Sequence, residues 1–284
     1  KIDNNVAIGQ SALGSTTTGF QGNYITAVGY EALKNDTWGY FNTGIGSSAL
    51  YSNTTGLANT AVGSNSLYSN TTANYNTAVG AAALGSNTTG ENNSAFGNFA
   101  LISNTTGSQN IAIGHSTMAA NTTGAFNSAV GFKSLRFNVV GSNNTAFGSY
   151  ALHYNTTNNN SAFGYKALYA NTIGTGNNAF GYKSLTSNTT GGLNGAFGFQ
   201  ALVLNTTGSS NNAFGYKALN SNTTGSANSA FGKDSLKYNT IGANNSAFGY
   251  RSLFGNTTGI NNSAFGYKAL TYNTTGSNNT AVGN

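Results

Sequence analysis

Hydrophobic and polar positions along the chain recur with a period of 17 residues. The clearest copy begins at Ala213 and reads Ala-Phe-Gly-Tyr-Lys-Ala-Leu-Asn-Ser-Asn-Thr-Thr-Gly-Ser-Ala-Asn-Ser, and the next copy begins at Ala230. Such a period is typical of repeat proteins, in which a single copy cannot bury its apolar side and stacks on its neighbours instead. The sequence therefore predicts one elongated repeat domain over residues 1–284.

Each copy opens with a small residue, a bulky apolar residue and Gly. The bulky residue is mostly Ile or Val in the early copies and is Phe in every copy from Phe147 to Phe265. β-Branched and aromatic residues favour strands. Because side chains alternate across a strand, we expect Phe231 to lie in the core between stacked coils and Ala230 and Gly232 to face the other way. Rows of Ala and Gly would let another backbone approach closely, either a second wall of the same coil or a neighbouring chain.

The rest of each copy contains two further segments. Tyr-Lys-Ala-Leu is compatible with a second short strand or with a single helical turn, and its recurring Leu indicates a core position. Asn-Thr-Thr-Gly has the composition of a tight corner. Asn residues recur at two phases, as at Asn222 and Asn228, and would form hydrogen-bonded amide ladders between coils. The predicted fold class is all-β, a repetitive β-solenoid or parallel β-roll with 17-residue coils stacked roughly 4.8 Å apart.

Two steps of the repeat depart from the common length. The step that ends at Ala27 has 20 residues, with the extra ones around Phe20 to Tyr24. The step that ends at Ala162 has 16, because the corner at 155–158 lacks its Gly. Both lie in the turn-like half of the copy, where insertions and deletions are tolerated best. The chain starts and stops within a copy, so we expect it to be a piece of a longer protein.

The composition argues against several classes of protein. Charged residues make up 6% of the chain, with a net charge of +6, and the basic residues are spread over many copies rather than gathered in runs. We therefore expect no nucleic-acid partner. No apolar run approaches the roughly 18 residues that cross a bilayer, so we expect no membrane insertion. The chain has no Cys, which excludes disulfides and thiolate metal sites.

Residues that could perform acid–base chemistry are few and far apart in the repeat. They are His115, His153, Asp3, Glu31, Asp36, Glu91 and Asp234. An active site needs such groups to converge, so we predict no enzyme, no catalytic residue and no cofactor. Asp is also too rare for the calcium-binding repeats that carry one in every copy. Glu31 and Lys34 are expected to form a local ion pair.

The Thr-rich corners suggest two other functions. Asn-Thr-Thr is formally a glycosylation sequon, although its recurrence fits turn and ladder residues better. Columns of Thr also suit an ice-binding face. Adjacent Thr side chains should point in different directions, however, so ice binding is the less favoured hypothesis.

One stripe of residues is a candidate contact surface. Aromatic and basic residues share one phase at Tyr165-Lys166, Tyr182-Lys183, Tyr216-Lys217, Tyr250-Arg251 and Tyr267-Lys268. Phe132-Lys133 belongs to the same phase, and Lys233-Asp234 interrupts it. Stacking would align these pairs into a ridge. Such a ridge either covers the edge of the core as a solvated surface or binds cell-surface glycans through ring stacking and charge.

The repeats resemble those of two families. Asn-Ser-Ala-Phe-Gly at 228–232, with variants at 76–80 and 110–114, is similar to the head repeats of trimeric autotransporter adhesins. The longer string at 264–276 is similar to repeats of bacteriophage tail-fibre-like proteins that carry an endosialidase-type chaperone domain. The resemblance covers almost the whole chain. It implies a left-handed β-roll and a homo-oligomer, a trimer by analogy, and it favours a neighbouring chain as the partner of the Ala and Gly rows.

Together these observations predict a non-enzymatic extracellular fibre protein, the shaft or head of an adhesive appendage on a cell surface or a virion. Its partners would be further copies of itself and cell-surface glycans. The alternative is a filament or sheath subunit that polymerises end to end, because an exposed terminal coil offers unpaired backbone groups.

Overall fold

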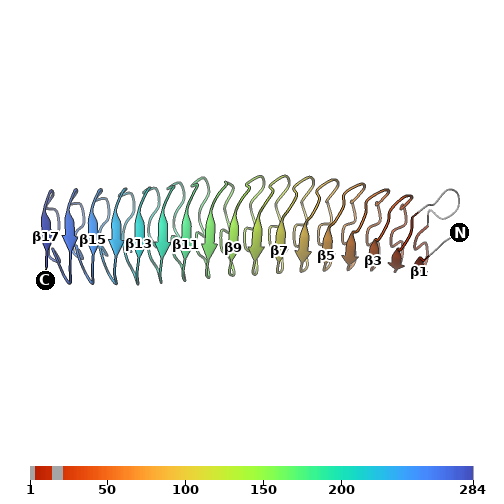
Figure 1. Cartoon of the computed structure of the whole chain (residues 1–284), viewed down its shortest axis with the longest axis horizontal. Helices are drawn as coiled ribbons and strands as arrows, with labels where there is room; N and C mark the ends of the chain where they lie inside the picture. Colours follow the sequence, from red (N-terminus) through yellow and green to blue (C-terminus); the bar gives the residue numbers. More distant parts are fainter. Residues whose placement is uncertain (1–3, 15–21, 284) are drawn as a thin grey trace. The chain divides into compact units, whose positions relative to one another are not determined.

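The computed structural model describes residues 4–14 and 22–283. This part of the chain is all-β, without a helix, and it divides into two compact units, Lys1–Asn143 (unit 1) and Asn144–Asn284 (unit 2) (Figure 1). Within each unit, every strand pairs in parallel with the strand of the next coil. Equivalent repeat positions lie opposite each other, as Ala213 does to Ala230. The predicted β-solenoid with 17-residue coils is therefore confirmed.

The described strands have three residues each. Those of unit 1 are β1 (Val6–Ile8), β2 (Thr26–Val28), β3 (Thr43–Ile45), β4 (Thr60–Val62), β5 (Thr77–Val79), β6 (Ser94–Phe96), β7 (Ile111–Ile113) and β8 (Ser128–Val130). Those of unit 2 are β9 (Thr145–Phe147), β10 (Ser161–Phe163), β11 (Asn178–Phe180), β12 (Gly195–Phe197), β13 (Asn212–Phe214), β14 (Ser229–Phe231), β15 (Ser246–Phe248), β16 (Ser263–Phe265) and β17 (Thr280–Val282).

The interior of each coil is narrow and is filled by small and branched apolar side chains. Ala213 of the strand and the Leu219 side chain of the turn are completely buried. One coil carries Gly44 in place of the strand Ala, and a Cβ built there would lie 3.1 Å from Leu33 Cδ1. The strand Ala therefore packs directly on Leu, and the coil leaves no room for a larger residue at this position.

The expectation that the Phe row forms the core was wrong. Phe147 is 40% exposed and Phe214 36% exposed, so these side chains lie on the outer face of the sheet. Strand alternation holds, but the inward position belongs to the residue that fits the narrow coil. The outer Phe rings of β9–β16 stack with centroids 4.5–5.2 Å apart and form a column, the Phe ladder. Its members are Phe147, Phe163, Phe180, Phe197, Phe214, Phe231, Phe248 and Phe265.

The Ala and Gly rows pack within their own solenoid, not against a neighbouring chain. The Ala residues of the row point into the coil, where they are completely buried. Gly215 has φ +142°, and a Cβ added to it would lie 2.5 Å from the carbonyl oxygen of Gly232 in the next coil. Only Gly tolerates both conditions. The expectation of a neighbouring chain was therefore wrong for the rows Ala196, Ala213, Ala230 and Gly198, Gly215, Gly232.

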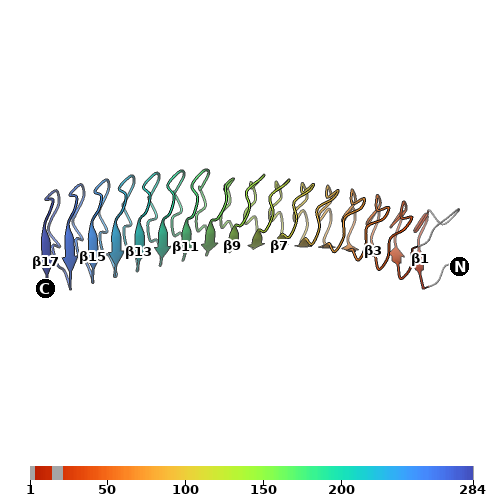
Figure 2. The same ribbon diagram turned by 45° about the horizontal axis from the view of Figure 1, so that its top comes forward.

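Tyr-Lys-Ala-Leu forms neither of the two expected structures. It is a turn in which Lys217 (φ 53°) and Leu219 (φ 49°) both adopt the left-handed conformation. The cost of this conformation is offset by backbone hydrogen bonds to the coils on either side. Lys217 N donates to Phe199 O at 2.9 Å, and Leu219 N donates to Ser235 O at 3.0 Å. Figure 2 shows these turns beside the strands of each unit.

Both predicted Asn ladders are confirmed. Asn222 Nδ2 donates to Asn205 Oδ1 at 2.8 Å and to Gly225 O at 2.9 Å, while Asn222 Oδ1 accepts from Asn239 Nδ2 at 2.8 Å. In the second ladder, the Asn228 backbone N–H and Nδ2 both donate to Asn211 Oδ1. These side chains are buried. Since Asn222 is also a sequon Asn, the folded chain does not present it for glycosylation.

The shortened coil keeps the ladder by changing its corner. Asn171 Nδ2 still donates to Asn155 Oδ1 at 2.8 Å, across 16 residues instead of 17. Asn155 Nδ2 donates to Thr157 O, and the Thr157 hydroxyl donates to Gly174 O. The deletion is thus absorbed at the corner, as expected. The insertion around Phe20 falls partly outside the described residues.

We expect Ala213→Asp to destabilise unit 2 by more than about 4 kcal/mol, because it places an unpaired carboxylate in the closed interior of a coil. Phe214→Asp, one residue along, should cost only about 1–2 kcal/mol through lost ring stacking. Urea unfolding followed by circular dichroism measures both. Equal unfolding midpoints for the two variants would contradict this assignment of faces.

Asn222→Ala should cost about 1–3 kcal/mol, because it leaves the amide groups of Asn205 and Asn239 without one ladder partner each. Thr224→Ala is the matched control: Thr224 lies in the same corner and is exposed, so its loss should change the free energy of unfolding by less than about 0.5 kcal/mol. The same urea titration compares them, and an effect of Asn222→Ala as small as the control's would speak against a structural ladder.

Candidate functional site

The aromatic residues at the predicted ridge phase stack along unit 2. Tyr165 and Tyr182 have ring centroids 5.6 Å apart, and Tyr182, Phe199 and Tyr216 follow at 5.2 and 5.3 Å. These four rings are 39–44% exposed. With the basic residues beside them they form what we call the basic aromatic ladder. Its members are Tyr165, Lys166, Tyr182, Lys183, Phe199, Tyr216, Lys217, Lys233, Tyr250, Arg251, Tyr267 and Lys268.

Apart from Lys233, the basic side chains of this ladder lie against the rings of their own coils. Lys183 Nζ is 5.3 Å from the Tyr182 ring centroid, and Lys217 Nζ is 5.3 Å from that of Tyr216. These distances are within the range of cation–π attraction. The left-handed conformation of Lys166, Lys183, Lys217, Arg251 and Lys268 directs each stem beside the ring, so ring and cation together form one surface element in these coils.

Lys233 does not break the ladder, although its position in the sequence suggested an interruption. Its Nζ lies 5.7 Å from the Tyr216 ring and 6.0 Å from the Tyr250 ring, so the ammonium group stands where a ring is missing. The following Asp234 is nearly buried and pairs with Lys237 at 3.2 Å. The basic aromatic ladder therefore presents a ring or a cation in every coil from Tyr165 to Tyr267.

Sequence reasoning missed two parts of this surface. Phe199 was overlooked because it is followed by Gln rather than Lys, although its phase in the repeat was readable. A cluster at the start of unit 2 was also missed: Lys166 Nζ lies 5.2–5.8 Å from the rings of Tyr150, Tyr165 and Tyr169. His153 stacks on Tyr169 with centroids 5.2 Å apart. These residues come from successive turns, and no sequence motif joins them.

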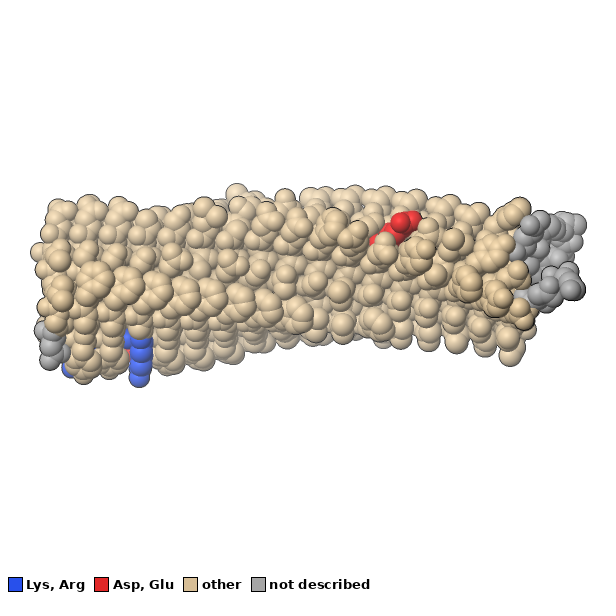
Figure 3. Space-filling view, viewed as in Figure 1, with Lys and Arg blue, Asp and Glu red and all other residues tan. Residues whose placement is uncertain are grey.

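Charge is distributed unequally between the two units. Unit 2 contains seven Lys and Arg against one Asp, which accounts for the whole formal net charge of +6, whereas unit 1 contains four basic and four acidic residues. Six of the seven basic residues of unit 2 belong to the ladder. Over unit 2, the face visible in Figure 3 shows charged side chains only along its lower edge. The positive potential of unit 2 is thus concentrated along one corner of its coils.

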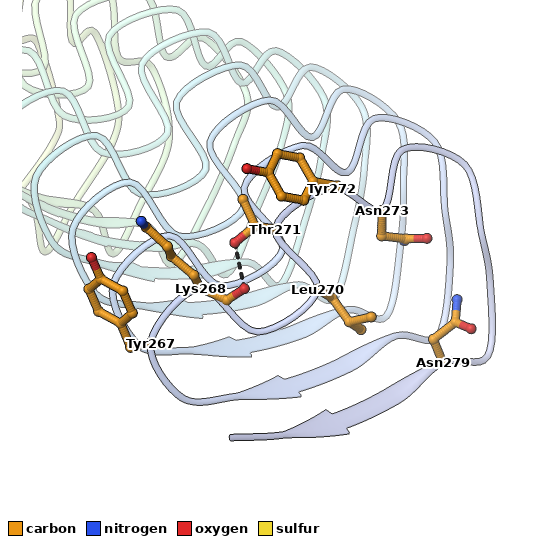
Figure 4. Close-up of a pocket in the computed structure, with 7 residues that line it drawn as sticks. All are labelled: Tyr267, Lys268, Leu270, Thr271, Tyr272, Asn273 and Asn279. Atoms are coloured by element: carbon orange, nitrogen blue, oxygen red, sulfur yellow. Dashed lines mark hydrogen bonds between the residues drawn. The ribbon is translucent and has the colours of Figure 1, made fainter. Parts of the chain in front are cut away.

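A hollow lies at the last coil of unit 2. Figure 4 shows the residues that line it: Tyr267, Lys268, Leu270, Thr271, Tyr272, Asn273 and Asn279. Leu270 and Asn273 are partly exposed here, whereas their equivalents Leu253 and Asn256 are buried beneath the following coil. The hollow is the uncovered side of the stacked interior and does not bring together a separate set of reactive groups.

Other candidate chemistry is sparse. Among the described residues, no group of three or more His, Asp or Glu side chains is placed to hold a metal ion. The described residues also contain no helix with the length and apolarity of a membrane span. The predicted ion pair is confirmed, with Lys34 Nζ 2.6 Å from Glu31 Oε1.

The two Thr residues of each corner have different surroundings. The Thr223 hydroxyl donates to Thr240 O of the next coil at 3.1 Å, while Thr224 is exposed. The exposed column is interrupted by Ile173 and Ile241. Of the two Thr columns of the corner, the one that contains Thr224 is exposed and is interrupted by Ile, which gives little support to a flat ice-binding face.

Asp36 is the one acidic residue among those that the structure describes that is built into an Asn ladder. It is completely buried at the position that Asn53 takes in the next coil, and its carboxylate accepts hydrogen bonds from Gly39 N at 2.7 Å and Asn42 Nδ2 at 3.4 Å. Burial raises the pKa of the Asp36 carboxyl group from 3.8 to about 6, against the opposing effect of these donors.

Comparison with protein-family models finds no match, and comparison with curated proteins finds none either. The class of the protein is therefore defined by its fold: it is a β-solenoid repeat protein.

We expect Asp36→Asn to stabilise the protein at neutral pH and to remove one pH dependence. Because the folded pKa lies above the unfolded value, the native chain holds an extra proton between about pH 4 and pH 6. The stability of the protonated form is fully present below pH 3.8 and is lost as pH rises through about 6. The loss amounts to at most about 3 kcal/mol. Thermal unfolding at pH 4 and pH 7.5 tests it. The variant should gain over the native chain only at pH 7.5, and an equal difference at both pH values would refute the linkage.

Proposed function

We propose that this protein is a non-enzymatic extracellular fibre protein whose unit 2 binds acidic polysaccharide through the basic aromatic ladder. The observation that carries the proposal is the concentration of charge: the net +6 of the chain belongs to unit 2, where six of seven basic residues lie beside stacked, exposed rings. Rings supply stacking surfaces for sugars, and the cations attract carboxylate or sulfate groups.

The spacing of the ladder favours a repeating ligand. From Tyr165 to Tyr216 successive rings are 5.2–5.6 Å apart, so a polymer lying along the ladder meets a ring, a cation or both in every coil. Each contact is weak because it is exposed, but contacts on one linked chain add through effective concentration. A small, isolated sugar would contact one coil only and would not gain affinity from the repeated contacts.

The body of each unit supports a structural role. Backbone pairing, two buried Asn ladders and Thr hydroxyl bonds all run from coil to coil, so neighbouring coils are joined at several points. The resemblance of the repeats to adhesin heads and tail-fibre-like proteins supports the same proposal, a shaft or head that displays contact residues in rows. Electron microscopy separates it from the alternative of an end-to-end filament: discrete particles are expected, and unbounded filaments would favour the polymer.

Replacing Tyr182, Lys183, Tyr216 and Lys217 together with Ser should reduce binding to an array of acidic polysaccharides at least tenfold and leave the fold intact, because no core residue changes. Binding by the native chain should weaken as salt is raised from 50 to 500 mM, since exposed charges are screened. The matched control, Thr190→Ser with Thr207→Ser and Thr224→Ser, should bind as the native chain does. Unchanged binding by the folded fourfold variant would mean that the ladder is only the solvated edge of the coils and does not bind the polysaccharide. Stronger binding to duplex DNA than to polysaccharide would mean that the proposed class of ligand is wrong.

A further inference from the structure

The Phe ladder is a second surface of unit 2, and nothing in the proposed function uses it. Its rings are nearly parallel, with interplanar angles of 1–10°. The ring edge reaches along the strand: a Cβ added to Gly195 would lie 3.5 Å from Phe197 Cε2. The rings therefore lie over the column formed by the first residue of each strand and create a smooth outer face.

The exposed area of this ladder is large for a single chain in water. Phe147, Phe214, Phe248 and Phe265 are 36–42% exposed, and the other four are half-buried. Taking roughly 200 Å² for each aromatic side chain, the eight rings expose roughly 600 Å² as one stripe. This is at the upper limit of the apolar patches of monomeric proteins. With the flanking column of small residues, it approaches the roughly 800 Å² that each partner buries in a standard interface.

The chemistry of the stripe excludes the ligand of the basic aromatic ladder. No residue of strands β9–β17 is charged. The first strand position carries only Ser, Thr, Asn or Gly, as at Ser229. A face without cations does not attract an acidic polymer, whereas depletion of charge and enrichment of aromatic residues mark the centre of protein interfaces.

We propose that the Phe ladder is the surface through which copies of this chain associate side by side. A second copy presents the same stripe with the same spacing of 4.5–5.2 Å, so the rings of two ladders can interdigitate along their whole length. A partner without this period would match only a few coils. The inference does not depend on the proposed function, because it concerns a different column of side chains.

Salt distinguishes the two surfaces. Each copy has a net charge of +6 on unit 2, so association brings like charges together. Added salt screens this repulsion and should strengthen association, while it weakens binding of acidic polysaccharide.

The test compares the mass of three full-length proteins by sedimentation equilibrium and light scattering. The native chain is expected to be oligomeric at micromolar concentration. Phe180→Thr with Phe197→Thr and Phe214→Thr should weaken association at least tenfold with an unchanged circular dichroism spectrum. The matched control, Tyr182→Thr with Phe199→Thr and Tyr216→Thr, removes three comparably placed rings from the same coils and should keep the native mass. A native monomer at 100 μM, or equal dissociation of both variants, would overturn the proposal.

If the Phe variant does not fold, a cross-linking experiment on the otherwise native chain tests whether the Phe ladder is the interface between copies. A benzophenone side chain is placed at position 229, beside the Phe ladder, or at position 224, on the exposed Thr column. Irradiation should give covalent dimers from position 229 and not from position 224. Absence of dimers from position 229, or equal yields from both positions, would exclude the Phe ladder as the interface.

Discussion

The hydrogen bond between the same asparagine in successive coils is the interaction on which each unit depends. Asn222 uses one amide group to close its own corner on Gly225 and to hold the coil before it through Asn205. Because the amide is buried, water cannot replace either partner. Every coil must therefore place a side-chain amide at the same corner position, in register with the amides of the neighbouring coils. This requirement explains why the 16-residue coil changes its corner but keeps Asn155 in register with Asn171.

This arrangement decides where large side chains can lie. The narrow interior is filled by amides, the strand Ala and the Leu of the turn, as at Ala213 and Leu219. Aromatic residues are consequently placed outside, and in-register stacking brings the rings of the Phe ladder, and those from Tyr165 to Tyr216, within 5.6 Å of their equivalents in the next coil. A repeat that packs small residues inside thus produces continuous stripes of large residues at its surface.

The two stripes of unit 2 differ in chemistry although they are only two residues apart in the repeat, as Phe214 and Tyr216 are. One is uncharged, and the other has a cation beside nearly every ring. Self-association and ligand binding make opposite demands on charge, since repulsion opposes the first and attraction drives the second. Placing them on separate columns lets one coil contribute to both.

The sequence by itself determined the period, the parallel in-register stacking, the two Asn ladders and the phase of the Tyr-Lys row, because in a stacked repeat each residue becomes the neighbour of its own copies. It also determined that Ala230 and Phe231 point in opposite directions. Only the tertiary structure decided which of them points inward, because alternation along a strand is the same for either choice. The inward strand position lies against the Leu of the turn, so that it admits Ala and excludes Phe. For the same reason the contacts of Lys233 and Lys166 with rings of other coils could not be read from the chain, since they depend on where each turn directs its side chains.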